Sequence, residues 1–136
     1  MRTSSLLMLV LFLGLQSCIA QRGYTEQIRK EGLRLSTKWG NAKDADGQRK
    51  TALLIAVENT SGQALEYSYA IRFYYEGILR ESGVMETECI ESRKSKVGKV
   101  SGTYFIPEKL SETQIKSGDF SYEIDDFEVK AVDVCE

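Results

Sequence analysis

Residues 64–76 read ALEYSYAIRFYYE, and the alternation within them decides the fold. Large apolar and aromatic side chains stand at every second position, and the positions between them carry mostly small, polar or charged side chains. Alternate side chains of a β-strand point to opposite faces, so a period of two predicts a strand with one buried face. The predicted core face comprises Leu65, Tyr67, Tyr69, Ile71, Phe73 and Tyr75.

Other strand-like segments lie on both sides of this one. Residues 33–39 also alternate, and residues 51–59 are apolar on both faces as far as Val57, which is typical of a central strand. Glu76-Gly77 favours a hairpin turn directly after the aromatic stretch. The remaining strand-like segments are 78–81, 84–91, 98–106, 120–124 and 127–135, with a turn at Asp125-Asp126 between the last two.

The number and spacing of these segments predict the fold class. They indicate an all-β protein with a single immunoglobulin-like antiparallel β-sandwich of seven or eight short strands over residues 33–136. A proline at the start and a glycine at the end predict one short helix near residues 107–117. Residues 93–99 are expected to form a basic loop, and residues 18–32 a polar tether or short helix.

The first residues indicate export. Arg2 precedes an apolar run of about ten residues at 6–15, which is the pattern of a signal peptide. That run is too short to cross a bilayer, which takes about 20 helical residues. The predicted signal peptide spans residues 1–17, with residues 1–20 as the alternative.

The two boundaries correspond to two processing routes. Leu15-Gln16-Ser17-Cys18 resembles the lipobox of bacterial lipoproteins, with a branched apolar residue three positions before the cysteine and a small residue just before it. The resemblance implies that Cys18 becomes the lipidated first residue and anchors the protein to a membrane. Cys18-Ile19-Ala20 also fits an ordinary signal peptidase site, which would leave Gln21 first and the protein soluble in the periplasm or secreted.

Two further cysteines point to a disulfide. Once Cys18 is lipidated or removed, Cys89 and Cys135 form an even set in an oxidising compartment, so we expect them to be bonded to each other. Two unpaired buried thiols are the alternative. Two cysteines without CxxC spacing or histidine do not make a zinc site.

Composition excludes several classes of function. The chain contains no histidine, which removes Ser-His-Asp and Cys-His catalysis and His-ligated zinc. A net charge of -2 and a pI near 5.4 give no overall basic field to concentrate nucleic acid. We therefore expect no catalytic residues, metal, cofactor or nucleic-acid partner.

Four residues are candidate contacts for a ligand or partner. Tyr74 is the aromatic residue on the charged face of the 64–76 strand, where a flat ring could stack on a glycan. Arg93, Lys94 and Lys96 concentrate positive charge in the basic loop and could attract an anionic partner. The structural alternatives are a packed edge residue for Tyr74 and an ordinary solvated loop for the basic residues.

Three further patterns have structural explanations. Residues 44–47 (DADG) suggest calcium, but alignment on an EF-hand loop places Ala42 and Leu53 at ligand positions, so a turn is expected. The acidic residues between 119 and 128 are expected to be solvated charges rather than paired catalytic carboxylates. Asn59-Thr60-Ser61 fits the N-glycosylation pattern in a predicted turn, which matters only for a eukaryotic source.

These expectations favour a non-enzymatic function. An early strand that ends in Val57-Glu58-Asn59-Thr60-Ser61-Gly62, followed by a long aromatic strand, is similar to small bacterial envelope sandwich domains of no defined activity. We expect an exported, lipid-anchored envelope protein that contacts another envelope protein as an accessory or assembly component. The alternatives are a glycan or surface-polymer binding module and a small exported inhibitor or immunity protein that uses the loop at 92–98.

Overall fold

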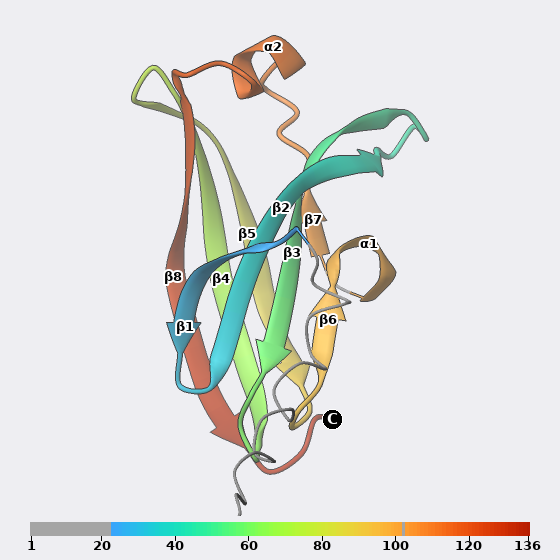
Figure 1. Cartoon of the computed structure of the whole chain (residues 1–136), viewed down its shortest axis with the longest axis vertical. Coiled ribbons are helices and arrows are strands. Elements are labelled where there is room, and N and C mark those ends of the chain that lie inside the picture. Colours follow the sequence, from blue (N-terminus) through green and yellow to red (C-terminus); the bar gives the residue numbers. More distant parts are fainter. Residues whose placement is uncertain (1–22, 102) are drawn as a thin grey trace, which may run out of the picture.

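In the computed structural model, which describes residues 23–101 and 103–136, two antiparallel β-sheets pack face to face (Figure 1). Two short helices, α1 (Gly98–Ser101) and α2 (Glu112–Ile115), complete the secondary structure of these residues. The strands are β1 (Thr25–Lys30), β2 (Leu33–Lys43), β3 (Arg49–Asn59), β4 (Ala64–Tyr75), β5 (Ile78–Ile90), β6 (Ser95–Val97), β7 (Thr103–Phe105) and β8 (Phe120–Val132). The predicted antiparallel β-sandwich with a short helix is confirmed.

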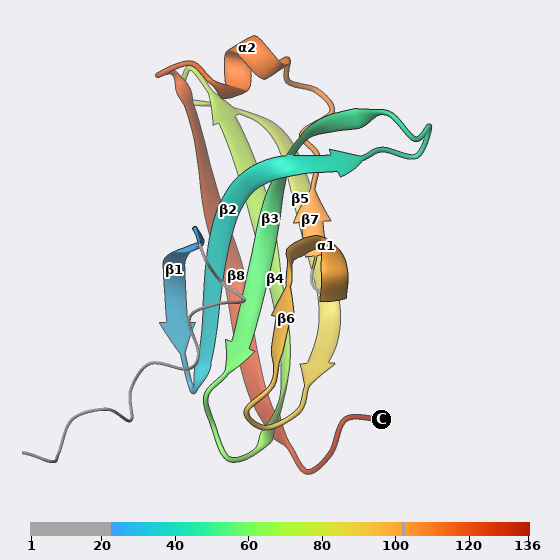
Figure 2. The same cartoon turned by 45° about the vertical axis from the view of Figure 1, so that its right-hand side comes forward.

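Sheet A has the strand order β1-β2-β3-β6, with β7 also paired to β3. β6 pairs with residues 56–58 of β3 and β7 with residues 53–55, so two short strands share one edge of β3. Helix α1 lies between them in the chain, and Figure 2 shows it beside that edge.

Sheet B has the order β5-β4-β8, with β4 in the centre. β5 and β8 each contain a bulge opposite the middle of β4. The pairing of β4 with β5 shifts register between Tyr67 and Tyr69 of β4, and its pairing with β8 shifts between Ser68 and Ala70. A bulge adds one residue to a strand and increases its twist. The three long strands therefore twist together along the molecule (Figures 1 and 2).

The core lies between the sheets, as the alternation predicts. Leu65, Tyr67, Tyr69, Ile71 and Phe73 of β4 are buried, and Tyr75 packs against them. Trp39 of β2 packs edge-on against two aromatic rings of β8, with centroid distances of 5.6 and 5.9 Å to Phe120 and Tyr122. On the side of sheet A, β3 contributes Leu53, Ile55 and Val57 to the same core.

The N-terminal part of the described chain differs from the prediction. Residues 25–30 form an edge strand of sheet A, where a tether or short helix was expected over residues 18–32. Glu31 and Gly32 both have a positive φ, which makes the tight hairpin turn into β2. Only Ile28 of this strand is partly buried, so the strand shows no apolar period in the sequence.

The C-terminal strand also differs. A turn was expected at Asp125-Asp126, but β8 continues through both residues, and the extra residue there forms a bulge. Asp126 has a φ of 51°, a conformation that aspartate tolerates better than most residues. The two polar residues that suggested a turn therefore provide the bulge.

Between residues 93 and 117 the predictions are correct only in part. The expected basic loop contains strand β6, and the strand expected over 98–106 is divided into α1 and β7. The predicted short helix is present within residues 107–117, but it is shorter than predicted and consists of α2 alone. Ser111 caps it, because its side chain accepts a hydrogen bond from the backbone of Gln114 while the Gln114 side chain accepts one from the backbone of Ser111.

The predicted disulfide is present. Cys89 near the end of β5 and Cys135 beyond β8 are bonded, with their Cα atoms 5.6 Å apart. The bond joins the two outer strands of sheet B across the end of β4. The predicted signal peptide and Cys18 lie outside the described residues.

Candidate functional site

The outer face of sheet B, which is the face turned away from sheet A, carries a charged cluster at its centre. Arg72 of β4 forms ion pairs with both Asp125 and Asp126 of β8, the second at 3.1 Å. The bulge in β8 makes this possible, because residues next to each other in a regular strand point to opposite faces. Two adjacent carboxylates therefore bind one guanidinium.

Tyr74 lies next to this cluster on the same face. Its ring is half-buried, and its hydroxyl is 3.4 Å from a carboxylate oxygen of Glu123. Partial desolvation, followed by the negative charge of Glu123, raises the pKa of Tyr74 above its ordinary value. The Tyr74 hydroxyl thus takes part in a polar contact on this face.

Apolar side chains border the cluster on the β5 side. Leu79 lies opposite Tyr74 and is 48% exposed, and Val84 lies opposite Ala70 and is 70% exposed. A shallow hollow of about 210 Å³ extends from Val84 to Asp126 across Ala70. The face therefore has an apolar part on β5 and a charged part on β8.

Acidic residues dominate sheet B. Its strands carry three basic side chains, which are Arg72, Arg80 and Lys130. They carry eight acidic side chains, which are Glu66, Glu81, Glu86, Glu88, Glu123, Asp125, Asp126 and Glu128. Glu123, Asp126 and Glu128 of β8 are exposed and lie along one edge of sheet B.

Sheet A has the opposite charge. Its strands and α1 carry two acidic side chains, Glu26 and Glu58. They carry nine basic side chains, which are Arg29, Lys30, Arg34, Lys38, Lys43, Arg49, Lys50, Lys96 and Lys99. A nearly neutral chain is thus folded into a basic sheet and an acidic sheet, and summed composition cannot show this separation.

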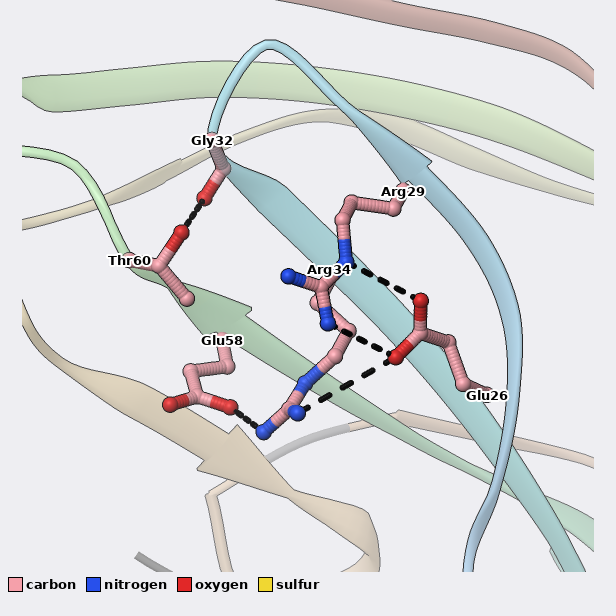
Figure 3. A network of polar contacts seen from close by, with 6 residues as sticks. All are labelled: Glu26, Arg29, Gly32, Arg34, Glu58 and Thr60. Carbon is pink, nitrogen blue, oxygen red and sulfur yellow. Dashed lines mark hydrogen bonds and ion pairs between the residues drawn. The ribbon is translucent and has the colours of Figure 1, made fainter. Parts of the chain in front are cut away.

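Part of the basic charge is held in a network on the outer face of sheet A (Figure 3). Glu26 accepts two hydrogen bonds from Arg29 at 3.0 Å and lies 4.0 Å from Arg34, which also pairs with Glu58. The hydrogen bonds from Arg29, assisted by the charges of both arginines, hold the pKa of Glu26 below its ordinary value. Next to this network, the Thr60 hydroxyl donates to the Gly32 carbonyl at 2.8 Å and ties two turns together.

The basic residues predicted as contacts lie apart from Tyr74. Tyr74 pairs with Leu79 near the β4–β5 turn, whereas Arg93 and Lys94 follow the opposite end of β5. The Lys94 carbonyl accepts the backbone N–H of Asn59 at 2.9 Å, and Lys96 forms a 3.1 Å ion pair with Glu88. The structure does not bring these four residues into one site.

The glycosylation pattern is structural. Asn59 is completely buried, and its side-chain nitrogen donates to the Gln63 carbonyl at 2.7 Å and lies 3.2 Å from the carbonyls of Ile90 and Glu91. Its oxygen accepts from the backbone and hydroxyl of Ser61. A glycan on this nitrogen is incompatible with the fold, because all of its hydrogen-bonding capacity is used inside the protein.

The expected turn at residues 44–47 is confirmed. One oxygen of Asp44 accepts backbone hydrogen bonds from Asp46 at 2.9 Å and Gln48 at 2.8 Å, and the other lies 3.4 Å from Lys50. These bonds, that from Gln48 first, lower the pKa of Asp44. Its carboxylate therefore closes the β2–β3 hairpin.

The comparisons give no relative to guide the choice between these surfaces. Within residues 23–101 and 103–136, no helix has the length and apolar character needed to span a membrane. No protein-family model matches the chain, and comparison with curated proteins and with solved structures gives no match.

Proposed function

We propose that this protein is a non-enzymatic, exported and lipid-anchored component of the cell envelope that acts through protein contacts in an accessory or assembly role. The lipobox-like Leu15-Gln16-Ser17-Cys18 supports the anchor. The disulfide between Cys89 and Cys135 fits an oxidising compartment. The protein contact is supported by the separation of charge between the two sheets.

The separation of charge between the sheets is the main support for a protein contact, because the sandwich does not need it to fold. The core accounts for stability, and exposed ion pairs contribute little to it, typically 0–1 kcal/mol each. Opposite charge on two faces does orient a molecule as it approaches a charged partner, and it raises the association rate. The acidic outer face of sheet B, with Leu79 and Val84 exposed beside it, is the surface we assign to a basic protein partner.

The anchor is tested by the intact mass of the full chain made in a bacterium that forms an envelope. We expect a diacyl or triacyl adduct on Cys18, and a gain of two protons on reduction of the disulfide. A chain that begins at Gln21 without lipid would contradict the anchor and leave a soluble periplasmic or secreted protein.

The protein contact is tested by isolating complexes of the full chain from envelope fractions at low and high salt. A partner held by the acidic face should be recovered in a fixed ratio at low salt and lost at high salt. Glu123→Lys on β8 should also remove it, whereas Arg49→Glu on sheet A serves as the matched charge-reversal control. Equal recovery with both variants would contradict the assignment of the contact to sheet B.

A further inference from the structure

One edge of β8 is open and regular over residues 121–125. In the described part of the chain, β8 pairs only with β4, so its other edge carries no strand. The backbone N–H of Glu76 donates to the Asp119 carbonyl at 3.0 Å, so these two residues are a hydrogen-bonded pair. In an antiparallel ladder such pairs recur at every second residue. By that alternation, Ser121, Glu123 and Asp125 direct their backbone groups to β4, whereas Tyr122 and Ile124 direct theirs outward.

Other parts of the edge strands of sheet B are in contact with the rest of the chain. Past the bulge of β8, the Lys30 ammonium donates to the outward Phe127 carbonyl at 3.0 Å. Along β5, Glu81 accepts the backbone N–H groups of Glu108 and Lys109, and the ring of Phe105 packs on Gly83. Lysine contacts, bulges and covering loops are the usual protection against edge pairing. In the described part of the chain, the outward N–H of Phe120 bonds to the Ser117 carbonyl, but no such contact reaches the outward backbone groups of Tyr122 and Ile124.

A groove runs along this open edge. It separates the last strand of sheet B from β1 at the edge of sheet A, and it has a volume of about 310 Å³. Tyr122, which lines the groove, bonds through its hydroxyl to the Thr37 hydroxyl at 2.7 Å. Its lining comprises Gln27, Ile28, Tyr122, Glu123, Ile124 and Asp125.

The geometry points to an extended segment of a partner protein that adds to sheet B as a strand beside residues 121–125. This inference rests on the proposed function and specifies the kind of side chains that the partner's segment carries. Side chains of an added strand would alternate between the groove, which offers Ile28 and Ile124, and the outer face, which offers Glu123 and Asp125. The segment we assign therefore alternates apolar with basic residues, because basic side chains match the acidic row and apolar ones fit the groove.

The test uses the full chain and a seven-residue peptide of alternating lysine and valine, blocked at both ends. Binding as a strand should slow amide hydrogen exchange at Tyr122 and Ile124 by about tenfold or more at saturating peptide. Exchange at Ser121 and Glu123 should not change, because those amides already bond to β4. Loose electrostatic binding would not produce this alternation.

Two charge reversals on the same strand provide the matched comparison. Glu123→Lys lies beside the open edge and should weaken peptide binding by about tenfold. Glu128→Lys makes the same change on the same face, but beyond the bulge where Lys30 closes the edge, and should change binding by less than about twofold. A peptide with glutamate in place of lysine should not bind.

Three results would overturn strand addition. They are uniform or absent protection at Tyr122 and Ile124, equal weakening by both variants, and a dimer of the chain alone that protects the same amides. The last would assign the edge to a second copy. None of these results alters the intact-mass or salt-dependent partner experiments, so failure here is distinguishable from failure of the proposed function.

Discussion

Arg72 Nη2 lies 3.1 Å from Asp126 Oδ2, although Asp126 has a backbone conformation that residues other than glycine seldom adopt. The same arginine also pairs with Asp125. Without Arg72, two neighbouring carboxylates would lie on one face next to Glu123. The bulge therefore places both carboxylates within reach of one guanidinium.

Replacing Arg72 should loosen this bulge. We expect Arg72→Gln to lower the free energy of unfolding by about 1 kcal/mol, since a guanidinium that neutralises two carboxylates is lost from a half-buried position. Lys116→Gln removes one exposed helical pair and should cost about 0.3 kcal/mol. Urea denaturation of both variants measures the difference, and equal losses would contradict a special role for Arg72.

Gly83 is predicted to be intolerant of a side chain. A Cβ atom there would overlap the ring of Phe105, so Gly83→Ala should cost about 2 kcal/mol. Gly62→Ala is the control, because a Cβ at that position has open space, and its effect should stay within about 0.5 kcal/mol. Adding Phe105→Leu to Gly83→Ala should restore part of the stability; no recovery would show that the overlap is not the cause.

The disulfide should make a large contribution to stability. It closes a loop with a sequence separation of 46, for which chain entropy gives about 4 kcal/mol. Cys89→Ser with Cys135→Ser should lower the free energy of unfolding by that order and increase amide exchange at the end of β8. A double variant as stable as the parent would contradict a structural role for the bond.

The buried tyrosines make stability depend on alkaline pH. Burial raises the pKa of Tyr67 and Tyr69 far above 10, and the nearby charge of Glu88 adds to this effect. Because the neutral form is favoured in the folded state, the contribution is fully present below pH 10 and is lost as pH rises above that value. Ultraviolet titration of the seven tyrosines should show Tyr67 and Tyr69 ionising only with unfolding. Reversible ionisation of all seven near pH 10 would contradict their burial.

The strands with one buried face could be predicted from the sequence because burial imposes a period of two. All six alternating residues from Leu65 to Tyr75 face the core. The period disappears where a strand has both faces polar, so β1 was not predicted, and Ile28 alone gave no pattern. Edge strands of this kind are recognised only when their partner strand is known.

The bulge and the charge separation could not be predicted for a different reason. Asp125-Asp126 suits a turn as well as a bulge, and only pairing with β4 decides between them. The opposite charges of the two sheets depend on which strands join which sheet, and β6 with Lys96 joins sheet A although it follows β5 in the chain. The disulfide was predictable because the expectation that Cys18 is lipidated or removed leaves only Cys89 and Cys135 to pair.

The central claim is that the acidic outer face of sheet B contacts another protein, and site-specific photo-cross-linking in intact cells tests it most directly. A photoreactive residue at Ser121, which is exposed on that face opposite Tyr74, should give one discrete protein adduct. The adduct should disappear when Glu123→Lys is added, and the same residue at Asn41, exposed on sheet A, should give none. Absence of an adduct at Ser121, or equal adducts from both positions, would contradict the account.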